Sequence, residues 1–398
     1  MDQASKKLAV MCTVIYFVSY LERHNYAAVI AEIIASGIAS ESAAAVTTAG
    51  FIMYGFGQLV SGFFGDWLSP RKLIFWGLLL TAWMNLLLPF CQTVWQMCLV
   101  WGVNGGAQAL LWPPMVKLLS VLSDQDYRCA CKNVTIGGAA GTIFIYCLVP
   151  LILTIGNWRM VFFICALFGM AATVFWRTEI GKALSGLPKP AEEKKTEREK
   201  KFFPVSCIPI TLLVLFAIIC QGLLRDGITT WTPVYLNQVY RLTTAVSILI
   251  TVFIPVLSVI GIQFAAKLHQ KVFTDELKCA MILFFAGAAS GLMLSIVPIS
   301  QPLLFAVGAA VITACMHGVN LMLITIFPRR YQQFGRIAMM SGLLNFSTYL
   351  GSAFSSIGFE WISQYFGWHW VVNIWMIISA AGAWLCWMAQ KKKFPQGE

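Results

Sequence analysis

Twelve long apolar stretches, joined by short polar connections, limit the possible folds of this 398-residue chain more than any other feature. A helix of about 20 apolar residues crosses the hydrocarbon core of a bilayer and satisfies its own backbone hydrogen bonds there. Only 11% of the residues are charged, whereas a soluble domain has roughly 25%. We therefore predict an all-α protein embedded in a lipid bilayer. The predicted spans are residues 8–28, 43–64, 73–91, 95–117, 131–154, 159–176, 206–232, 244–266, 279–298, 302–326, 337–359 and 369–389.

The basic residues predict the orientation of these spans. If the N-terminus is cytoplasmic, the connections on that side carry 24 of the 28 Lys and Arg residues. This bias follows the positive-inside rule, so we expect both termini in the cytoplasm. The formal net charge of +11 then reflects membrane orientation and gives no reason to expect a nucleic-acid partner. The short outer connections fit a multi-pass protein of a bacterial inner membrane.

A polar stretch at residues 177–204 divides the chain into two halves. Its mixed charge, its prolines and its scarcity of apolar residues are typical of a solvated linker. We expect an N-terminal six-helix bundle at residues 1–176, a cytoplasmic linker, and a C-terminal six-helix bundle at residues 205–398. The halves also resemble each other weakly, since residues 21–23 match residues 223–225 at an offset of 202. Two such repeats around a central cavity are typical of secondary transporters.

Two arginines, Arg23 and Arg225, fall inside predicted spans at matched positions of the two halves. An arginine at the bilayer centre costs about 2.5–3.5 kcal/mol on insertion scales, so each needs a partner or a water-filled cavity. In a pseudo-two-fold bundle the two side chains would face each other, and like charges need an anion between them. A guanidinium fork suits the oxygens of phosphate or another oxyanion. We therefore predict that Arg23 and Arg225 clamp an anionic substrate.

A purely structural interpretation of the two arginines stays open. Glu22 and Asp226 are their sequence neighbours, and either acid could neutralise an arginine in an ion pair. In that case the substrate need not be anionic. Adjacent residues of a helix point about 100° apart. We therefore expect neither carboxylate to lie on the face of its arginine.

Other polar residues share helix faces with this clamp. Tyr16, Tyr20 and Arg23 lie at i, i+4 and i+7, which places them on one stripe of the span at 8–28. Gln108 and Trp112 lie four residues apart in the span at 95–117. Phenol, amide and indole groups can orient an oxygen-rich solute without adding charge. Contacts between helices are the alternative role for the same residues.

The connection after the second span resembles a signature of the major facilitator superfamily. Residues 62–72 contain Asp66, followed by Pro70, Arg71 and Lys72, in a G-x-x-x-D pattern with a basic pair. An acid at a helix end can pair with cations beyond it and hold one conformation closed. We expect Asp66 and Arg71 to form such a conformational gate; a solvated turn with orientation charges is the alternative.

Motifs in three spans resemble the organophosphate:phosphate antiporter family of that superfamily. Residues 20–25 are similar to its Y-L-x-R-x-N pattern, and residues 224–236 to its L-R-x-G-I-x-x-W-[ST]-P-x-Y-L pattern. Residues 108–114 look like its Q-G-x-x-W-P-P pattern. The similarity runs over nearly the whole chain, and the 224–236 motif is the most specific part. The resemblance implies the twelve-helix fold of that superfamily, with two pseudo-symmetric bundles.

The resemblance also implies a function, namely exchange of a phosphorylated organic solute for inorganic phosphate by a rocker-switch motion. It gives Arg23 and Arg225 the role of phosphate-binding arginines. The residues that it places along the substrate cavity are Tyr16, Tyr20, Tyr54, Gln108, Trp112 and Tyr349.

Three cationic or titratable positions of that family differ here. The lysine expected after the first arginine is His24, a cavity lysine is Gln58, and the position of a histidine aligns near Ala139. Fewer cations attract a doubly charged phosphate less strongly. A monoanionic phosphodiester, phosphonate, sulfonate or carboxylate is therefore an alternative substrate, with proton coupling through Asp226 or His24.

We expect a secondary active transporter of a small organic anion, most of all an organophosphate exchanged for phosphate by alternating access. The alternatives are a proton-coupled organic anion symporter and a transporter-like sugar phosphate sensor. No P-loop pattern occurs, so a gradient must drive transport. No arrangement of nucleophile and base indicates an enzyme. The four histidines are scattered, and we expect no metal and no cofactor. The pathway should lie within one chain, which predicts a functional monomer.

Overall fold

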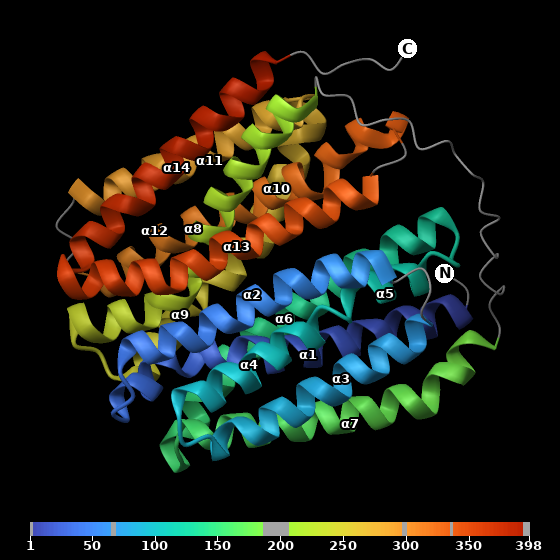
Figure 1. Cartoon of the computed structure of the whole chain (residues 1–398), viewed down its shortest axis with the longest axis horizontal. Helices are drawn as coiled ribbons and strands as arrows, with labels where there is room; N and C mark the ends of the chain where they lie inside the picture. The colour runs from blue at the N-terminus through green and yellow to red at the C-terminus, as the bar shows by residue number, and fades with distance from the viewer. Residues whose placement is uncertain (1–2, 65–68, 186–206, 297–300, 335–336, 393–398) are drawn as a thin grey trace. The chain divides into compact units, whose positions relative to one another are not determined.

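The structure is a computed structural model that describes residues 3–64, 69–185, 207–296, 301–334 and 337–392. The elements of these ranges are helices (Figure 1), so the predicted all-α class is confirmed. The chain groups into two compact units, one of Met1–Gly37 with Ala49–Thr196 and one of Ile38–Thr48 with Glu197–Glu398. Helix α2 therefore contributes its first turns to the second unit and the rest to the first.

The first unit contains α1 and α3 to α7 with most of α2, which run from blue to green in Figure 1. Helix α1 packs along α6 and α7, and α3 packs along α7 and α4. Helix α1 therefore has a neighbouring helix on more than one side, and its buried residues face different neighbours. The bounds are α1 Gln3–Ala35, α2 Ser40–Phe64, α3 Pro70–Leu87, α4 Val94–Gln108, α5 Trp112–Leu119, α6 Asp124–Ile155 and α7 Trp158–Leu184.

The second unit is built around α8, which packs on α13, α14 and α12. Its helices are α8 Ile208–Tyr240, α9 Thr244–Thr251, α10 Phe253–Lys271, α11 Glu276–Ile296, α12 Pro302–Asn320, α13 Ile337–Tyr365 and α14 Trp368–Lys391. Helix α12 continues as a π-helical segment at Leu321–Ile326 and a 3-10 segment at Phe327–Phe334.

The predicted spans correspond closely to the helices. Among the described residues, ten helical segments are long and apolar enough to cross a membrane, and they match ten of the twelve predicted stretches. The remaining two are also helical. Residues 95–117 form two helices instead of one, and residues 337–359 lie in α13, whose serines lower its mean hydropathy.

Prolines explain the interruptions that hydropathy did not predict. Pro113 and Pro114 have no N–H to donate to the carbonyls four residues earlier, so α4 ends at Gln108 and α5 begins at Trp112. In the same way, Pro255 cannot donate to the carbonyl of Thr251, the residue at which α9 ends.

Glycines set the distance between α8 and α13. A Cβ at Gly222 would collide with the carbonyl of Thr348, and one at Gly351 would collide with that of Ile219. Small residues let helix backbones approach closely within a membrane. The serines of α13 therefore lie against the turn of α8 that carries Arg225.

The first residues of the predicted linker belong to helix α7. Helix α7 continues to Leu184, and Glu179 within it accepts from Lys182 at 2.7 Å and pairs with Lys7 of α1 at 3.4 Å. Residues 186–204 lie outside the described part of the chain.

Candidate functional site

Arg23 lies in an aromatic environment on α1. Its guanidinium carbon is 4.0 Å from the ring centroid of Tyr54, a buried residue of α2, and 5.7 Å from that of Tyr20. A cation over an aromatic face is stabilised by about 0.5–2 kcal/mol, with the larger values where water is excluded. Arg23 and His24 are half-buried, whereas Glu22 and Asn25 on either side of them are buried. The face of α1 that carries Arg23 is thus its more accessible face.

The predicted stripe beside Arg23 forms a continuous cluster. The rings of Tyr16 and Tyr20 lie 4.8 Å apart and their hydroxyls 3.4 Å apart. Trp112, at the start of α5, lies 5.2 Å from Tyr16, and His24 lies 5.2 Å from Tyr20. We call Tyr16, Tyr20, Tyr54 and Trp112 the N-terminal aromatic cluster. Tyr20 and Tyr54 contact Arg23 directly, and Tyr16 and Trp112 extend the cluster from Tyr20. The contact of these four predicted residues with substrate stays a prediction.

Gln108 makes a contact between helices. Its side-chain Nε2 donates to the carbonyl of Ser19 at 3.0 Å, and 4% of the residue is exposed. This bond fixes the last turn of α4 to α1 immediately before the break at Ala109. A role for Gln108 in binding substrate stays a prediction.

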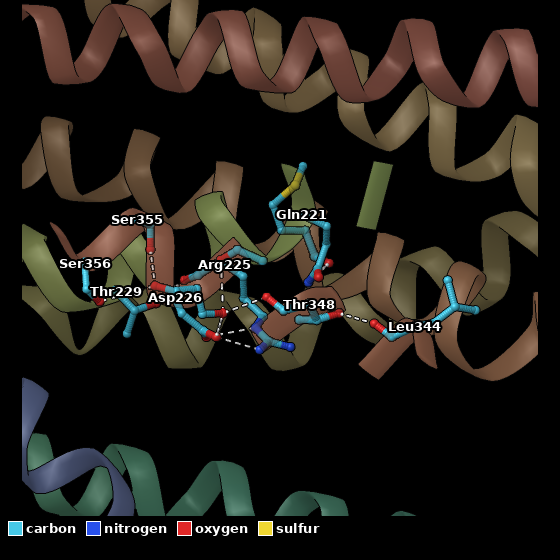
Figure 2. A network of polar contacts seen from close by, with 11 residues as sticks. Gln221, Arg225, Asp226, Thr229, Leu344, Thr348, Ser355 and Ser356 are labelled. Carbon is cyan, nitrogen blue, oxygen red and sulfur yellow. Dashed lines mark hydrogen bonds and ion pairs between the residues drawn. The ribbon is translucent and has the colours of Figure 1, made fainter. Parts of the chain in front are cut away.

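Arg225 lies in a carboxylate environment on α8. Its Nε donates to Oδ1 of Asp226 at 2.8 Å, and its second terminal nitrogen donates to Oδ2 at 2.6 Å. Ser352 of α13 donates its hydroxyl to the same Oδ2 at 2.5 Å. Figure 2 shows Arg225 and Asp226 within this network, with Thr348 and Ser355 of α13 beside them. Tyr349, predicted to bind substrate, has its ring centroid 5.4 Å from the Arg225 guanidinium carbon.

The expectation that neither neighbouring acid would reach its arginine is wrong for Asp226. The Cβ atoms of adjacent helical residues do diverge, but the arginine side chain is long enough to bend back across that angle. The hydroxyl of Ser352 also holds the carboxylate beside α8. Glu22 behaves as expected, because both of its carboxylate oxygens lack hydrogen-bond partners within the described residues.

His317 is a residue of this region that sequence reasoning treated only as one of four scattered histidines. It is half-buried on α12 and lies within electrostatic range of both Arg225 and Asp226. The π-helical segment that begins at Leu321 follows one turn later, and π-turns are frequent at functional sites. A polar residue in the middle of an otherwise apolar span was the available signal.

The predicted gate is described only in part. Asp66 lies outside the described residues, whereas Arg71 is exposed in the first turn of α3, and its carbonyl accepts from the Trp176 indole at 3.1 Å. The gate therefore stays a prediction. Across the described ranges, no group of three or more His, Cys, Asp or Glu side chains is arranged to hold a metal ion.

Comparisons with known proteins give a consistent result. The family model of the Major Facilitator Superfamily matches residues 12–355. The glycerol-3-phosphate transporter of Bacillus subtilis (strain 168) is 24% identical over 409 aligned residues, which cover 93% of this chain and 89% of that protein. The probable hexose phosphate transport protein of Chlamydia muridarum (strain MoPn / Nigg) is 23% identical over 355, covering 80% and 76%.

The fold is also that of solved transporters. A bacterial homologue of the human lysosomal transporter Spinster, crystallised in an inward-facing and unoccupied conformation, superposes with a TM-score of 0.82. The two chains are 12% identical, and the match covers 98% of each. At this level of identity the likeness concerns the fold.

Proposed function

Because this chain belongs to the Major Facilitator Superfamily, we propose that it moves a small organic anion, above all a phosphate ester, in exchange for inorganic phosphate. The chain is a multi-pass membrane transporter and not an enzyme. The resemblance to organophosphate transporters that its motifs predicted is confirmed by the relatives named above.

The observation that carries this proposal is a pair of arginines on the first helix of each half. Arg23 on α1 and Arg225 on α8 both lie inside their own helical unit and both have a tyrosine ring within 6 Å, Tyr54 at 4.0 Å and Tyr349 at 5.4 Å. Keeping a charged group inside a membrane protein is costly, and such residues mark substrate pathways. We propose that both guanidiniums bind one anion during the transport cycle.

The N-terminal aromatic cluster supports an organic substrate over a bare inorganic ion. Tyr20, which contacts Arg23, and its neighbours Tyr16 and Trp112 present apolar ring faces together with hydroxyl or indole donors. Such side chains combine an apolar body with a polar tip. A sugar or glycerol moiety has apolar C–H groups and polar hydroxyls. The rings would hold this organic part while the arginines hold the phosphate.

A second mode, proton-coupled symport, is favoured by the bidentate pair of Arg225 and Asp226. An incoming anion competes with the Asp226 carboxylate for the same guanidinium fork. Protonation of Asp226 would weaken that pair and release the fork. A proton and an anion would then bind together. His317, within electrostatic range of Asp226, would be a further titratable group to test, as would His24 on α1.

The proposal extends to the setting of the protein. We propose a bacterial inner-membrane location with both termini in the cytoplasm, because the basic residues follow the predicted inner connections. We also propose that residues 1–176 and 205–398 form the two moving halves, and that a monomer is the working unit.

The test is counterflow in liposomes that contain the purified full chain. Vesicles loaded with inorganic phosphate are given labelled glycerol 3-phosphate, glucose 6-phosphate, methylphosphonate or fumarate. Uptake of a phosphate ester that depends on internal phosphate supports exchange. Uptake of any of these anions that depends on a proton gradient alone supports symport. Saturable binding without flux indicates a sensor and contradicts the proposal, as does the absence of uptake for all four anions.

A further inference from the structure

The carboxyl group of Glu22 is buried on the side of α1 away from Arg23. The residue is 0% exposed, and neither carboxylate oxygen has a hydrogen-bond partner within the described residues. Buried carboxylates are normally paired or hydrogen-bonded, since an uncompensated buried charge costs several kcal/mol. A carboxyl group in this position therefore needs a physical explanation that the arginine site does not provide.

The neighbouring helix leaves space for this side chain. A Cβ at Gly169 of α7 would collide with Oε1 of Glu22 and would lie 2.8 Å from the Cβ of Ala82 of α3. Cys165, one turn earlier on α7, lies within electrostatic range of Glu22 and donates its thiol to the carbonyl of Leu21 at 3.8 Å. The carboxyl group thus occupies a hollow bounded by α1, α3 and α7.

Three asparagines surround the backbone of this turn without reaching the carboxyl group. Asn85 and Asn104 donate to the carbonyl of Glu22 at 3.3 and 3.4 Å. The amide oxygen of Asn85 accepts from Asn25 at 2.6 Å, that of Asn104 accepts from Asn85 at 3.5 Å, and that of Asn25 accepts from the backbone of Tyr26 at 2.9 Å. Because each amide oxygen already has a donor, the hollow does not offer the set of oxygen ligands that a hard cation such as sodium prefers.

The groups that face Glu22 do not stabilise a negative charge. Helix α7 presents the Cys165 thiol, α3 and α4 present the amides of Asn85 and Asn104, and on α1 the guanidinium of Arg23 lies over Tyr54. Within the described residues, neither oxygen of this fully buried carboxyl group has a hydrogen-bond donor. The neutral acid is the form that such surroundings tolerate.

We propose that Glu22 is a proton-binding site, separate from the arginine site, whose proton crosses the membrane together with the transported anion. This inference rests on the proposed transport function. Glu22 and Arg23 are successive residues of α1, so a shift of α1 on anion binding at Arg23 also moves the Glu22 carboxyl group relative to Gly169. Once water reaches it, the carboxylic acid gives its proton to that water, and it takes a proton back from the water on the other side.

Exchange and net uptake then differ in what they require of Glu22. During exchange of one anion for another the proton stays on the carboxyl group, so no net proton movement accompanies it. During net uptake the proton must be released inside. An amide at position 22 resembles the protonated acid in shape but carries no exchangeable acid proton, so it should allow exchange and block proton-driven uptake.

The experiment uses the full chain in liposomes that contain a pH-sensitive dye, with labelled glycerol 3-phosphate as the probe. In the wild type, a proton gradient should drive net uptake, and proton entry should accompany it. In Glu22→Gln, proton-driven uptake should fall by about tenfold or more, while counterflow stays within about twofold. Glu32→Gln, a half-buried glutamate on the same helix, is the matched control and should behave like the wild type.

Several results would overturn the inference. Wild-type net uptake that neither follows a proton gradient nor brings protons in would do so, as would proton-driven uptake that survives in Glu22→Gln. Uptake that follows a sodium gradient and is lost in Glu22→Gln would assign a different ion. If the wild type shows no counterflow, the proposed transport function is contradicted instead. If Glu22→Gln does not fold, infrared spectra of the wild type labelled with carbon-13 glutamate should show the carbonyl band of a protonated acid at neutral pH, and its absence would contradict the proposal.

Discussion

Arg23 and Arg225 hold matched positions in the two halves, and each has an acidic neighbour in sequence, yet the two acids lie in different places. Asp226 forms a bidentate ion pair with Arg225 and accepts from Ser352. Glu22 turns away from Arg23 into the hollow beside Gly169. The difference shows that the neighbouring helix determines the position of each carboxylate. The Ser352 hydroxyl on α13 holds the Asp226 carboxylate beside Arg225, and Gly169 on α7, which has no side chain, leaves space for the Glu22 carboxyl group.

This contrast has a consequence for anion binding. The guanidinium of Arg23 lies over the rings of Tyr54 and Tyr20. The guanidinium of Arg225 is engaged by Asp226, so an anion must compete with a carboxylate that is already in place. We therefore expect anion binding in the C-terminal half to displace the Asp226 carboxylate from Arg225.

The largest effect is expected from breaking the C-terminal pair. Arg225→Ala leaves the Asp226 carboxylate, 15% exposed, without its cation, which should destabilise the protein by about 3 kcal/mol. Thermal unfolding of the detergent-solubilised protein measures this loss. The double variant Arg225→Ala/Asp226→Ala removes the orphaned charge and should be more stable than the single variant. Equal stability of the two would show that the pair does not matter to the fold.

A smaller loss should follow from filling the hollow beside Glu22. Gly169→Ala places a methyl group on Oε1 of Glu22, and overpacking of this kind costs roughly 1–3 kcal/mol. Gly181→Ala, on the same helix with open space around it, is the control and should be neutral or slightly stabilising. Combining Gly169→Ala with Glu22→Ala should restore most of the melting temperature. A Gly169→Ala protein that melts like the wild type would contradict the placement of Glu22.

The bond from Ser352 to Asp226 should contribute about 1 kcal/mol, the net value of an ordinary hydrogen bond, because the Ser352 hydroxyl shares its proton with other acceptors. The Ser352 hydroxyl also lies 3.1 Å from the carbonyl of Thr348, so its loss removes a shared bond. Ser352→Ala should lower the melting temperature more than Ser355→Ala, because Ser355 donates within its own helix at 2.8 Å. The reverse order would argue that Asp226 is held by Arg225 alone.

The smallest effects concern the rings over the arginines. Tyr54→Leu removes a ring 4.0 Å from the Arg23 guanidinium carbon and should weaken anion binding by about 0.5–1 kcal/mol. Tyr349→Leu, with its ring 5.4 Å from Arg225, should change binding less, because Asp226 already orients that guanidinium. Titration of the purified variants with inorganic phosphate separates the two. A larger effect at Tyr349 would contradict the role of Asp226 in orienting Arg225.

The fold followed from the sequence because apolar length and membrane thickness leave few choices for these segments. The cluster of Tyr16 and Tyr20 beside Arg23 followed equally from helical spacing, which is a local property. The pair of Arg225 with Asp226 did not, because the spacing rule describes Cβ directions and neglects the reach of an arginine side chain. The position of Glu22 depends on Gly169, far along the chain, and that of His317 on the packing of α12 against α8. Contacts of this kind form only when the helices pack together, so local sequence spacing does not predict them.

The central claim is that Arg23 and Arg225 bind the same anion, and the most direct test is the affinity of Arg23→Lys and Arg225→Lys for inorganic phosphate. Lysine keeps the charge but loses the fork, and a bidentate contact exceeds the ~1.4 kcal/mol that corresponds to tenfold in affinity. We predict that each variant binds phosphate more than tenfold more weakly than the wild type while its melting temperature stays close to that of the wild type. Unchanged affinity in both folded variants would contradict the claim.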